Sequence, residues 1–286
     1  MQSHLSQKNE INSPRLREIV EKRRRQTRLK RIAISAIVVV LLSVCIFIIK
    51  RPALQIYDVD VLGAEVVDTR AVQQAMVTDI SGHILFVIPR TSRFFYPKKK
   101  IMTDLRAQFP RIKTLSVKLS GRTLTATMTE HTIDYLWCGV DTAVNPDCYS
   151  VDTDGSIFSE APDFSGTIYF RFFTPVSGDP INGVVLPDTE LANVISFVHA
   201  LKTAGFPAKA FALKPDGTRE FFLSGDFSGN KQVIILGPET DFTKATTNLL
   251  SALAVQPLKK DMATKQSKLD YIDLRYTDKV YYKFEQ

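Results

Sequence analysis

The feature of this sequence that most limits its folding is residues 32–49, a run of 18 residues without a charge, a proline or a glycine. As a helix this run would be about 27 Å long, close to the thickness of the hydrocarbon layer of a membrane. A secretory signal peptide has a shorter apolar run and a small-residue cleavage site, whereas Lys50, Arg51 and Pro52 follow here. We therefore expect residues 32–49 to form an uncleaved transmembrane helix.

The positive charge of the chain is concentrated before this run. The net charge is +7, and residues 1–31 hold ten basic and three acidic side chains, so the rest of the chain is neutral. This argues against a nucleic-acid partner. The positive-inside rule makes residues 1–31 a basic cytoplasmic tail and puts the residues after the helix outside. The tail, which we expect to be disordered, either only fixes this topology or also binds anionic lipid headgroups, at about 1 kcal/mol per charge.

Two of the three cysteines, Cys138 and Cys148, lie close together in the part expected outside the cytoplasm, where thiols can oxidise. A disulfide between them would close a loop of about 11 residues and contribute on the order of 3 kcal/mol. The alternative is two free thiols. A zinc site is not expected, because no second cysteine pair or nearby histidine completes four ligands.

The exported part reads as two α/β regions. In residues 53–132, a strand near 56–62 is followed by a helix after Asp68, a helix between Pro97 and Pro110, and two strands around Gly121. In residues 133–286, Asp-Gly turns at 154–155 and 216–217 separate short strands, and two amphipathic helices begin near 188 and 241. The expected fold class is α+β with one transmembrane helix.

The last segment alternates apolar and polar residues from Ile272 to Phe284, which is typical of a half-buried strand. The apolar residues keep the even positions on both sides of residues 277–279. After a hairpin loop of two residues, the apolar residues would instead continue on the odd positions. We therefore expect either one bent strand or a hairpin with a loop of three residues, 277–279.

Candidate catalytic and cofactor-binding residues are few. The four histidines are scattered, and the sequence lacks the zinc-protease, serine-hydrolase and phosphate-loop motifs. The stretch around Asp154 is similar to a calcium loop, but Gly155 comes two positions too early, so a β-turn is the better interpretation. We expect no catalytic residue, no metal, no cofactor and no enzymatic activity. The segment RFFYPKKK at 93–100 either touches the outer membrane surface or simply begins a solvated helix.

Three segments together resemble the bacterial division proteins FtsQ and DivIB. They are FPRIKTLSVKLSGRTLTATMTEHTIDYLW, CYSVDTDGSIFSEAP and YIDLRYTDKVYYKF, in this order and spacing, behind a basic tail and one membrane helix. The resemblance covers most of the chain and implies a POTRA domain at 53–132 and a C-terminal β domain at 133–286. The pair Cys138 and Cys148, and a histidine rather than an arginine after Glu130, depart from the family pattern.

The resemblance implies a scaffold without enzymatic activity in the inner membrane at the division septum. It would bind FtsB- and FtsL-like single-pass proteins and other members of the division machinery outside the cytoplasm, and so act on septal peptidoglycan synthesis. An exposed strand edge can accept a partner strand. The expected partner-binding residues are Arg275, Tyr276, Lys279, Val280, Tyr282 and Phe284.

Two other classes of function stay open. One is another membrane-anchored envelope-binding protein with a POTRA domain, which would bind partners away from the septum. The other is an anchored envelope enzyme, which needs a convergent polar pocket. Localisation in dividing cells separates the first from a division scaffold, and hydrolase activity on peptidoglycan would reveal the second.

Overall fold

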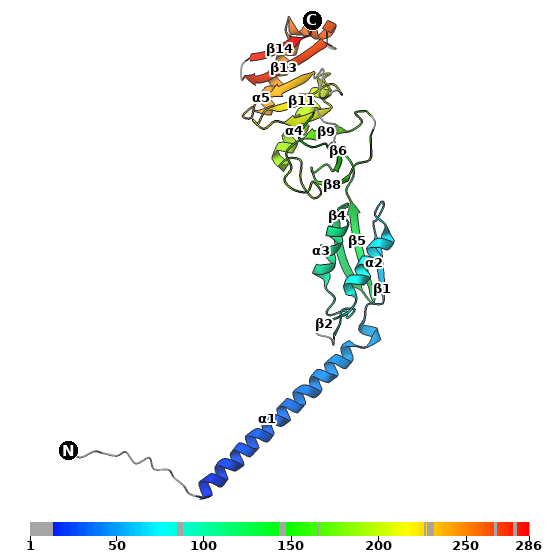
Figure 1. Ribbon diagram of the computed structural model, residues 1–286, viewed down its shortest axis with the longest axis vertical. Helices are drawn as coiled ribbons and strands as arrows, with labels where there is room; N and C mark the ends of the chain where they lie inside the picture. Colours follow the sequence, from blue (N-terminus) through cyan, green and yellow to red (C-terminus); the bar gives the residue numbers. More distant parts are fainter. Residues whose placement is uncertain are drawn as a thin grey trace, which may run out of the picture. The chain divides into compact units, whose positions relative to one another are not determined.

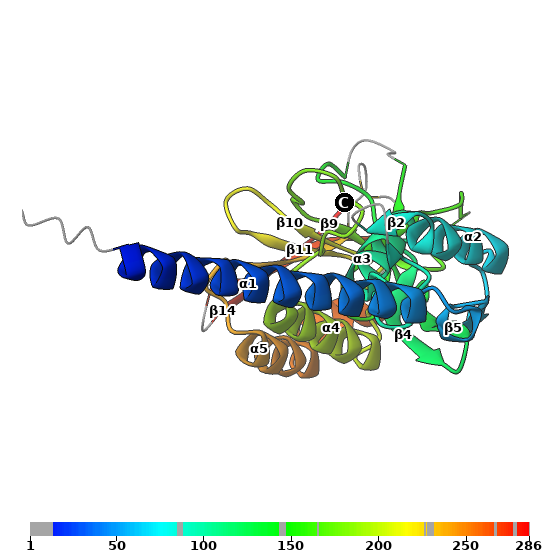
Figure 2. The same ribbon diagram turned by 90° about the horizontal axis from the view of Figure 1, so that it is seen from below.

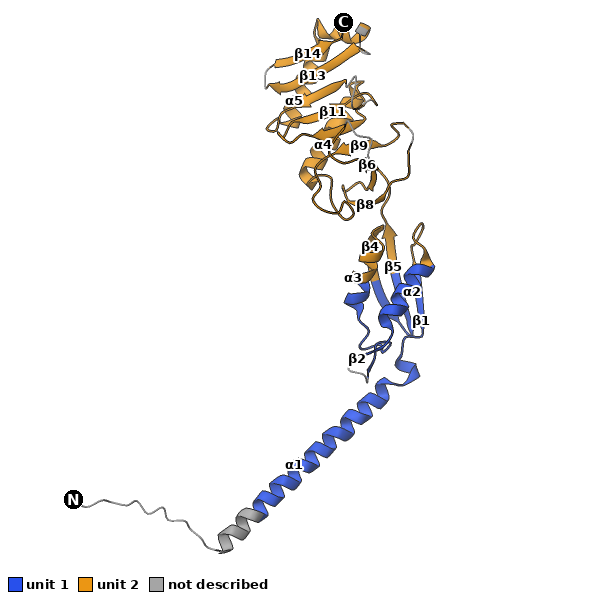
Figure 3. Ribbon diagram, in the orientation of Figure 1, with its two compact units in different colours: residues 1–61, 70–102, 117–126 blue, residues 62–69, 103–116, 127–286 orange. Residues whose placement is uncertain are grey.

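The computed structural model describes residues 14–84, 88–142, 147–164, 166–225, 227, 232–265, 268–276 and 279–285, with side chains from residue 22 onward. The fold mixes α and β structure (Figure 1). Contacts divide the chain into two units, the first made of residues 1–61, 70–102 and 117–126, and the second of 62–69, 103–116 and 127–286 (Figure 3). The predicted domain limits at 53–132 and 133–286 stay a prediction.

One helix, α1 (Pro14–Ile49), contains residues 14–31 of the basic tail and the whole apolar run. Its part from Lys22 to Ile49 is the one helix in the described chain that is long and apolar enough to cross a membrane. The expectation of a disordered tail is wrong from Pro14 onward. Between Arg15 and Arg31 the tail has no proline or glycine and is rich in arginine, lysine and glutamate. These residues have high helix propensity. The helix can also extend into them from the apolar segment, so no separate nucleation step is needed.

A three-stranded sheet in the order β1-β5-β4 follows α1. The expected strands and helices are all present, and a small β2–β3 hairpin that the sequence did not predict lies between the helices. In α2, Val72, Met76 and Ile80 recur at four-residue spacing, and this places them on one buried face of the helix. The elements are β1 (Asp58–Leu62), α2 (Thr69–Ile80), β2 (His83–Ile84), β3 (Ile88–Pro89), α3 (Lys98–Gln108), β4 (Ile112–Ser120) and β5 (Thr123–Glu130).

A nine-stranded sheet in the order β14-β13-β12-β11-β10-β9-β6-β7-β8 forms the second region. Both Asp-Gly turns lie between antiparallel strands, as expected. Gly155 has φ +81°, and a Cβ there would come within 2.9 Å of Leu191 Cδ2, so glycine is required at this turn. The strands are β6 (Tyr135–Trp137), β7 (Tyr149–Val151), β8 (Ile157–Glu160), β9 (Phe170–Phe173), β10 (Ala210–Leu213), β11 (Arg219–Phe222), β12 (Val233–Leu236), β13 (Leu269–Tyr276) and β14 (Lys279–Phe284).

Both faces of this sheet are covered. On one face lie α4 (Asp188–Thr203) and α5 (Phe242–Ala254), side by side (Figure 2), together with α6 (Leu258–Lys265). In β10, Phe211 joins the core under the helices while Ala210 and Ala212 join a smaller cluster on the opposite face. This alternation follows from the two-residue repeat of a strand. The sheet therefore has two buried layers, and its edges are where a partner can reach the backbone.

The last two strands form an antiparallel hairpin in which Tyr276 pairs with Lys279. The expected loop of three residues is wrong, because Lys279 is already part of β14; residues 277–278 lie outside the described residues. The pairing changes register between Asp273 and Tyr276. An extra residue in one strand changes which residues face each other, so this irregularity keeps the apolar residues on the even positions.

Candidate partner-binding surface and a buried ionic cluster

β14 is an edge strand, and among the described residues nothing pairs with its outer side. The opposite edge differs. There, Ile157 of β8 donates its N–H to Gly183 and accepts a hydrogen bond from Asn182, so a loop covers it. In an antiparallel strand, alternate N–H and C=O groups point away from the paired neighbour. The outer side of β14 therefore offers backbone donors and acceptors for one more strand.

The two faces of β14 differ in exposure. Val280, Tyr282 and Phe284 are half-buried and pack against the core under the helices. Tyr276 and Tyr281 are 53% and 46% exposed, and their rings meet edge to face at 5.2 Å. A partner strand would therefore meet this tyrosine pair directly. The sequence pattern selected Tyr276 but not Tyr281, because Tyr281 stands among the polar odd positions.

Arg275 is held in place beside the hairpin by Asp273. The Arg275 side chain donates from Nη2 to Asp273 Oδ2 at 2.6 Å and from Nε to both carboxylate oxygens at 3.0 Å. Burial alone would raise the pKa of Asp273, but the hydrogen bonds from Arg275 outweigh it and hold that pKa below its ordinary value. The Arg275 side chain stays 47% exposed, so part of the guanidinium still faces solvent.

Two shallow grooves lie on this part of the sheet, one at the end of β13 and one at β14. The first, of about 400 Å³, is lined by residues 237–241 and by Lys244 and Ala245 of α5, together with residues 274–276 of β13. The second, of about 360 Å³, is lined by the end of α5, by residues 255–258, and by Val280 and Tyr282 of β14. Of the two, the second groove is lined by residues of β14 itself, so side chains of an added strand could enter it. The predicted partner-binding residues thus line the grooves or the edge itself, although their role in binding stays a prediction.

Cys138 and Cys148 form a disulfide. Cys138 follows β6 and is buried in the cluster on the face of the sheet opposite the helices. Cys148 precedes β7 and packs partly against the same cluster. The bond therefore joins the two ends of the connection between neighbouring strands.

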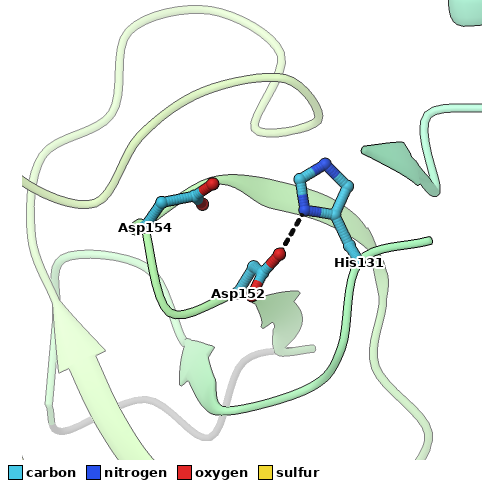
Figure 4. A group of neighbouring side chains, drawn as sticks. All are labelled: His131, Asp152 and Asp154. Carbon is cyan, nitrogen blue, oxygen red and sulfur yellow. Dashed lines mark hydrogen bonds and ion pairs between the residues drawn. The ribbon is translucent and has the colours of Figure 1, made fainter. Parts of the chain in front are cut away.

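A buried carboxylate, Asp152, lies at the centre of a cluster that the sequence analysis did not single out (Figure 4). Its side chain is 2% exposed and meets Lys113 Nζ at 2.8 Å and His131 Nδ1 at 2.6 Å. It also accepts hydrogen bonds from the backbone and hydroxyl of Thr153. Burial would raise the pKa of Asp152, but these hydrogen bonds lower it to about 2. The carboxylate therefore stays ionised at neutral pH.

His131, Asp152 and Asp154 have ligand atoms within 4.8 Å of one another, close enough to hold a metal ion. Lys113, however, lies between the two carboxylates, 2.8 Å from Asp152 and 3.2 Å from Asp154. Its hydrogen bond to Asp152 outweighs desolvation and raises the pKa of Lys113. The ammonium thus supplies the positive charge that a metal would bring, and we interpret the cluster as an ionic clamp between the start of β4, the segment after β5 and the β7–β8 turn.

Glu130, next to His131, holds the loop after β1. Its Oε1 accepts hydrogen bonds from the backbone N–H groups of Glu65, Val66 and Val67, at 2.7 to 3.0 Å, and its Oε2 accepts one from Arg111. Desolvation would raise the pKa of Glu130, but these donors lower it. A single carboxylate therefore satisfies three neighbouring backbone donors.

Two stretches that carry the resemblance, TEH at 129–131 and VDTDG at 151–155, meet in this cluster. His131 and Arg111 also both contact Phe158, with the imidazole stacked at 5.1 Å and the guanidinium 5.3 Å from the ring centre. A structural role of Glu130, His131 and Asp152 was not apparent from the sequence, because their main side-chain partners are 19 to 39 residues apart. An acid next to a histidine, and an Asp-Gly turn beginning with a second acid, were the available signs.

A scan against protein-family models found no match for this chain, and a search among curated proteins found none either. The resemblance to FtsQ and DivIB therefore rests on the three segments and their order, and stays a prediction.

Proposed function

We propose that this chain is a membrane-anchored scaffold of the bacterial division machinery, of the FtsQ and DivIB type, and not an enzyme. In this proposal α1 is an uncleaved anchor with its basic end in the cytoplasm, residues 53–132 are a POTRA domain and residues 133–286 are the partner-binding β domain. The protein would assemble or regulate septal peptidoglycan synthesis at the inner membrane by holding FtsB- and FtsL-like proteins at the outer side of β14.

The observation that supports this function best is the uncovered edge of β14 at the end of a nine-stranded sheet. An added strand of four or five residues would form several backbone hydrogen bonds, each worth about 0.5–1.5 kcal/mol net. Tyr276 and Tyr281 would add apolar contact. Lys279 is exposed and Arg275 is half-exposed, so an acidic partner segment fits best.

Lysines on an edge strand also protect it from pairing with a second copy of itself. Lys279 and Lys283 have this effect in β14, and the Lys283 ammonium lies 2.7 Å from Asp270 on the neighbouring strand. The two roles are compatible, because charges that repel another copy of β14 attract an acidic segment.

The test follows a fluorescent fusion at the N-terminus of the full chain in dividing cells of the source organism or a close relative. A wild-type band at the division site, together with recruitment of the FtsB-like partner, is expected. An even distribution in constricting cells would instead favour the general envelope-binding class. Hydrolysis of peptidoglycan by the purified chain would favour the enzyme class.

A variant combining Tyr276→Glu, Lys279→Glu and Tyr281→Glu tests the edge itself. All three side chains are exposed, so the fold should persist while recruitment of the partner is lost. Ile168→Glu is the matched control, because Ile168 is 73% exposed and lies away from the terminal hairpin in sequence. Recruitment by the triple variant at the wild-type level would show that β14 is not the binding edge.

A further inference from the structure

The segment that follows β3 and enters α3 carries aromatic and basic side chains, and its backbone is bonded to residues 54–56, shortly after the membrane helix. We define the juxtamembrane loop as residues 91–98, which include Phe94, Phe95 and Lys98. We propose that this loop rests in the headgroup layer of the membrane that holds α1, with its phenylalanines among the upper acyl chains and its basic side chains on anionic lipid. The inference rests on the anchoring role of α1 proposed above.

The backbone ties this loop to the residues directly after α1. Arg93 donates its N–H to Leu54 at 3.0 Å, Gln55 forms a bridge with Ser92, and Ile56 donates to Thr91 at 2.7 Å. Residues 91–93 are thus fixed to a segment that begins five residues after Ile49, the end of α1.

The connection itself is compact. Gln55 Nε2 donates to the carbonyl of Lys50 at 3.1 Å, and Leu54 donates its N–H to the carbonyl of Arg51 at 2.9 Å. Five residues span at most about 17 Å even when fully extended. A folded connection spans less, and the headgroup layer on each side of a bilayer is itself roughly 5–8 Å deep. The loop is therefore within reach of the lipid surface whenever α1 spans the membrane.

The side chains of the loop suit a lipid surface. Phe94 and Phe95 are 64% and 44% exposed, whereas Ser92, one of the tethered residues, is fully buried. Phe95 donates its N–H to the carbonyl of Ser92 at 3.0 Å, so the exposed rings project from a fixed turn. Two neighbouring phenylalanines facing water are unfavourable, and large apolar side chains of this kind are what membrane-surface segments insert.

A second element brings another aromatic and basic pair to the same tethered segment. Tyr57, which follows Ile56, is 82% exposed, and the guanidinium of Arg122 lies 4.8 Å from its ring centre. The N–H of Tyr57 donates to the carbonyl of Arg122 at 2.9 Å, so the β4–β5 turn meets the chain here. Tyrosine and arginine both favour the boundary between lipid and water.

Charge favours anionic lipid over other occupants of this surface. Arg93, Lys98 and Arg122 are all exposed, and each basic side chain near an anionic surface contributes about 1 kcal/mol. Asp58, which follows Tyr57, is an exposed acid, and its carboxylate accepts a hydrogen bond from the N–H of Val59. The balance of charge next to the phenylalanines is therefore positive, which fits a layer of lipid phosphates.

The test places single tryptophans in the full chain, reconstituted into bilayers whose acyl chains carry bromine, a quencher of tryptophan emission. The parent protein, whose one tryptophan is Trp137, gives the background to subtract. Phe94→Trp reports on the loop and Val40→Trp reports on insertion of α1. Val66→Trp is the control, because Val66 is 66% exposed but follows the far end of β1. Bilayers with and without phosphatidylglycerol test the role of anionic lipid.

The expected result is loss of emission and a shift to shorter wavelength for Phe94→Trp and Val40→Trp, with no change for Val66→Trp. Quenching of Phe94→Trp should be stronger with phosphatidylglycerol and should weaken when Arg93→Glu and Lys98→Glu are added. Quenching at Val40 without quenching at Phe94 would overturn this inference alone. A wavelength shift at Phe94 without quenching would mean that a protein surface covers the loop, and would also overturn it. No quenching at Val40 would refute the anchoring role, and the inference with it.

Discussion

Replacing Asp152 by asparagine should lower the free energy of unfolding by roughly 2 kcal/mol at neutral pH. The pKa of Asp152 is about 2 in the folded chain against an ordinary value of 3.8. Each unit of difference between the folded and unfolded pKa values corresponds to about 1.4 kcal/mol in the free energy of unfolding. Solvent screens this interaction weakly, because the Asp152 side chain is only 2% exposed. The variant leaves Lys113 with one carboxylate instead of two.

The effect should depend on pH in a defined direction. Because the folded-state pKa of Asp152 lies below the unfolded value, the folded chain binds fewer protons than the unfolded chain between the two values. The stabilisation is therefore complete above about pH 5, decreases as the pH falls through about 4, and is gone below about pH 2. The difference between wild type and Asp152→Asn should shrink over the same range.

Urea unfolding of the full chain in detergent micelles, followed by the emission of Trp137, would measure this difference. Trp137 is the one tryptophan of the chain, is 8% exposed, and donates its Nε1–H to the carbonyl of Thr174. Asp154→Asn is the matched control, since that side chain is 46% exposed and its ion pair with Lys113 should contribute at most about 1 kcal/mol. An equal loss of stability for Asp152→Asn at neutral and strongly acidic pH would refute the electrostatic explanation, because a packing defect does not titrate.

Two further predictions concern the loop after β1 and the disulfide. Glu130→Gln should weaken three charge-assisted hydrogen bonds and speed amide exchange at residues 65–67, with a loss of roughly 1–3 kcal/mol. Glu65→Gln, at an exposed position, should leave exchange unchanged, and equal rates in both variants would contradict the role of Glu130. Reducing the disulfide, or replacing Cys138 and Cys148 by serine, should lower the free energy of unfolding by about 3 kcal/mol. The same urea midpoint with and without reductant would disprove that contribution, and Cys45→Ser serves as the control.

Elements whose pattern is local could be predicted from the sequence. The amphipathic pattern that begins near residue 188 predicted α4, and Leu191, Val194 and Leu201 on its apolar face are buried. The Asp-Gly turn at 216–217 predicted the pairing of β10 with β11, since glycine there takes φ +82°. In these cases the residues that determine the structure lie in the same stretch of chain as the helix or turn that they form.

Features that depend on distant partners could not be predicted. Lys113 and Asp152 are 39 residues apart, and nothing near either one indicates the other. The irregular register between Asp273 and Tyr276 also has no sign in the nearby sequence. Without it, apolar residues on even positions in both strands predict a loop of three residues, which is one residue too long. The helix in the tail differs, because its sign is local: residues 15–31 contain good helix formers and neither proline nor glycine.

The continuity of α1 has a mechanical consequence. From Pro14 to Ile49 the helix would be about 54 Å long, roughly twice the thickness of the hydrocarbon layer. A helical rod resists twisting and bending far more than a flexible linker of equal length. If its apolar half spans the bilayer, any tilt or rotation of that half moves the arginines of the other half as one body. A force on the exported part of the chain would then produce a torque on the basic part of α1 on the other side of the membrane.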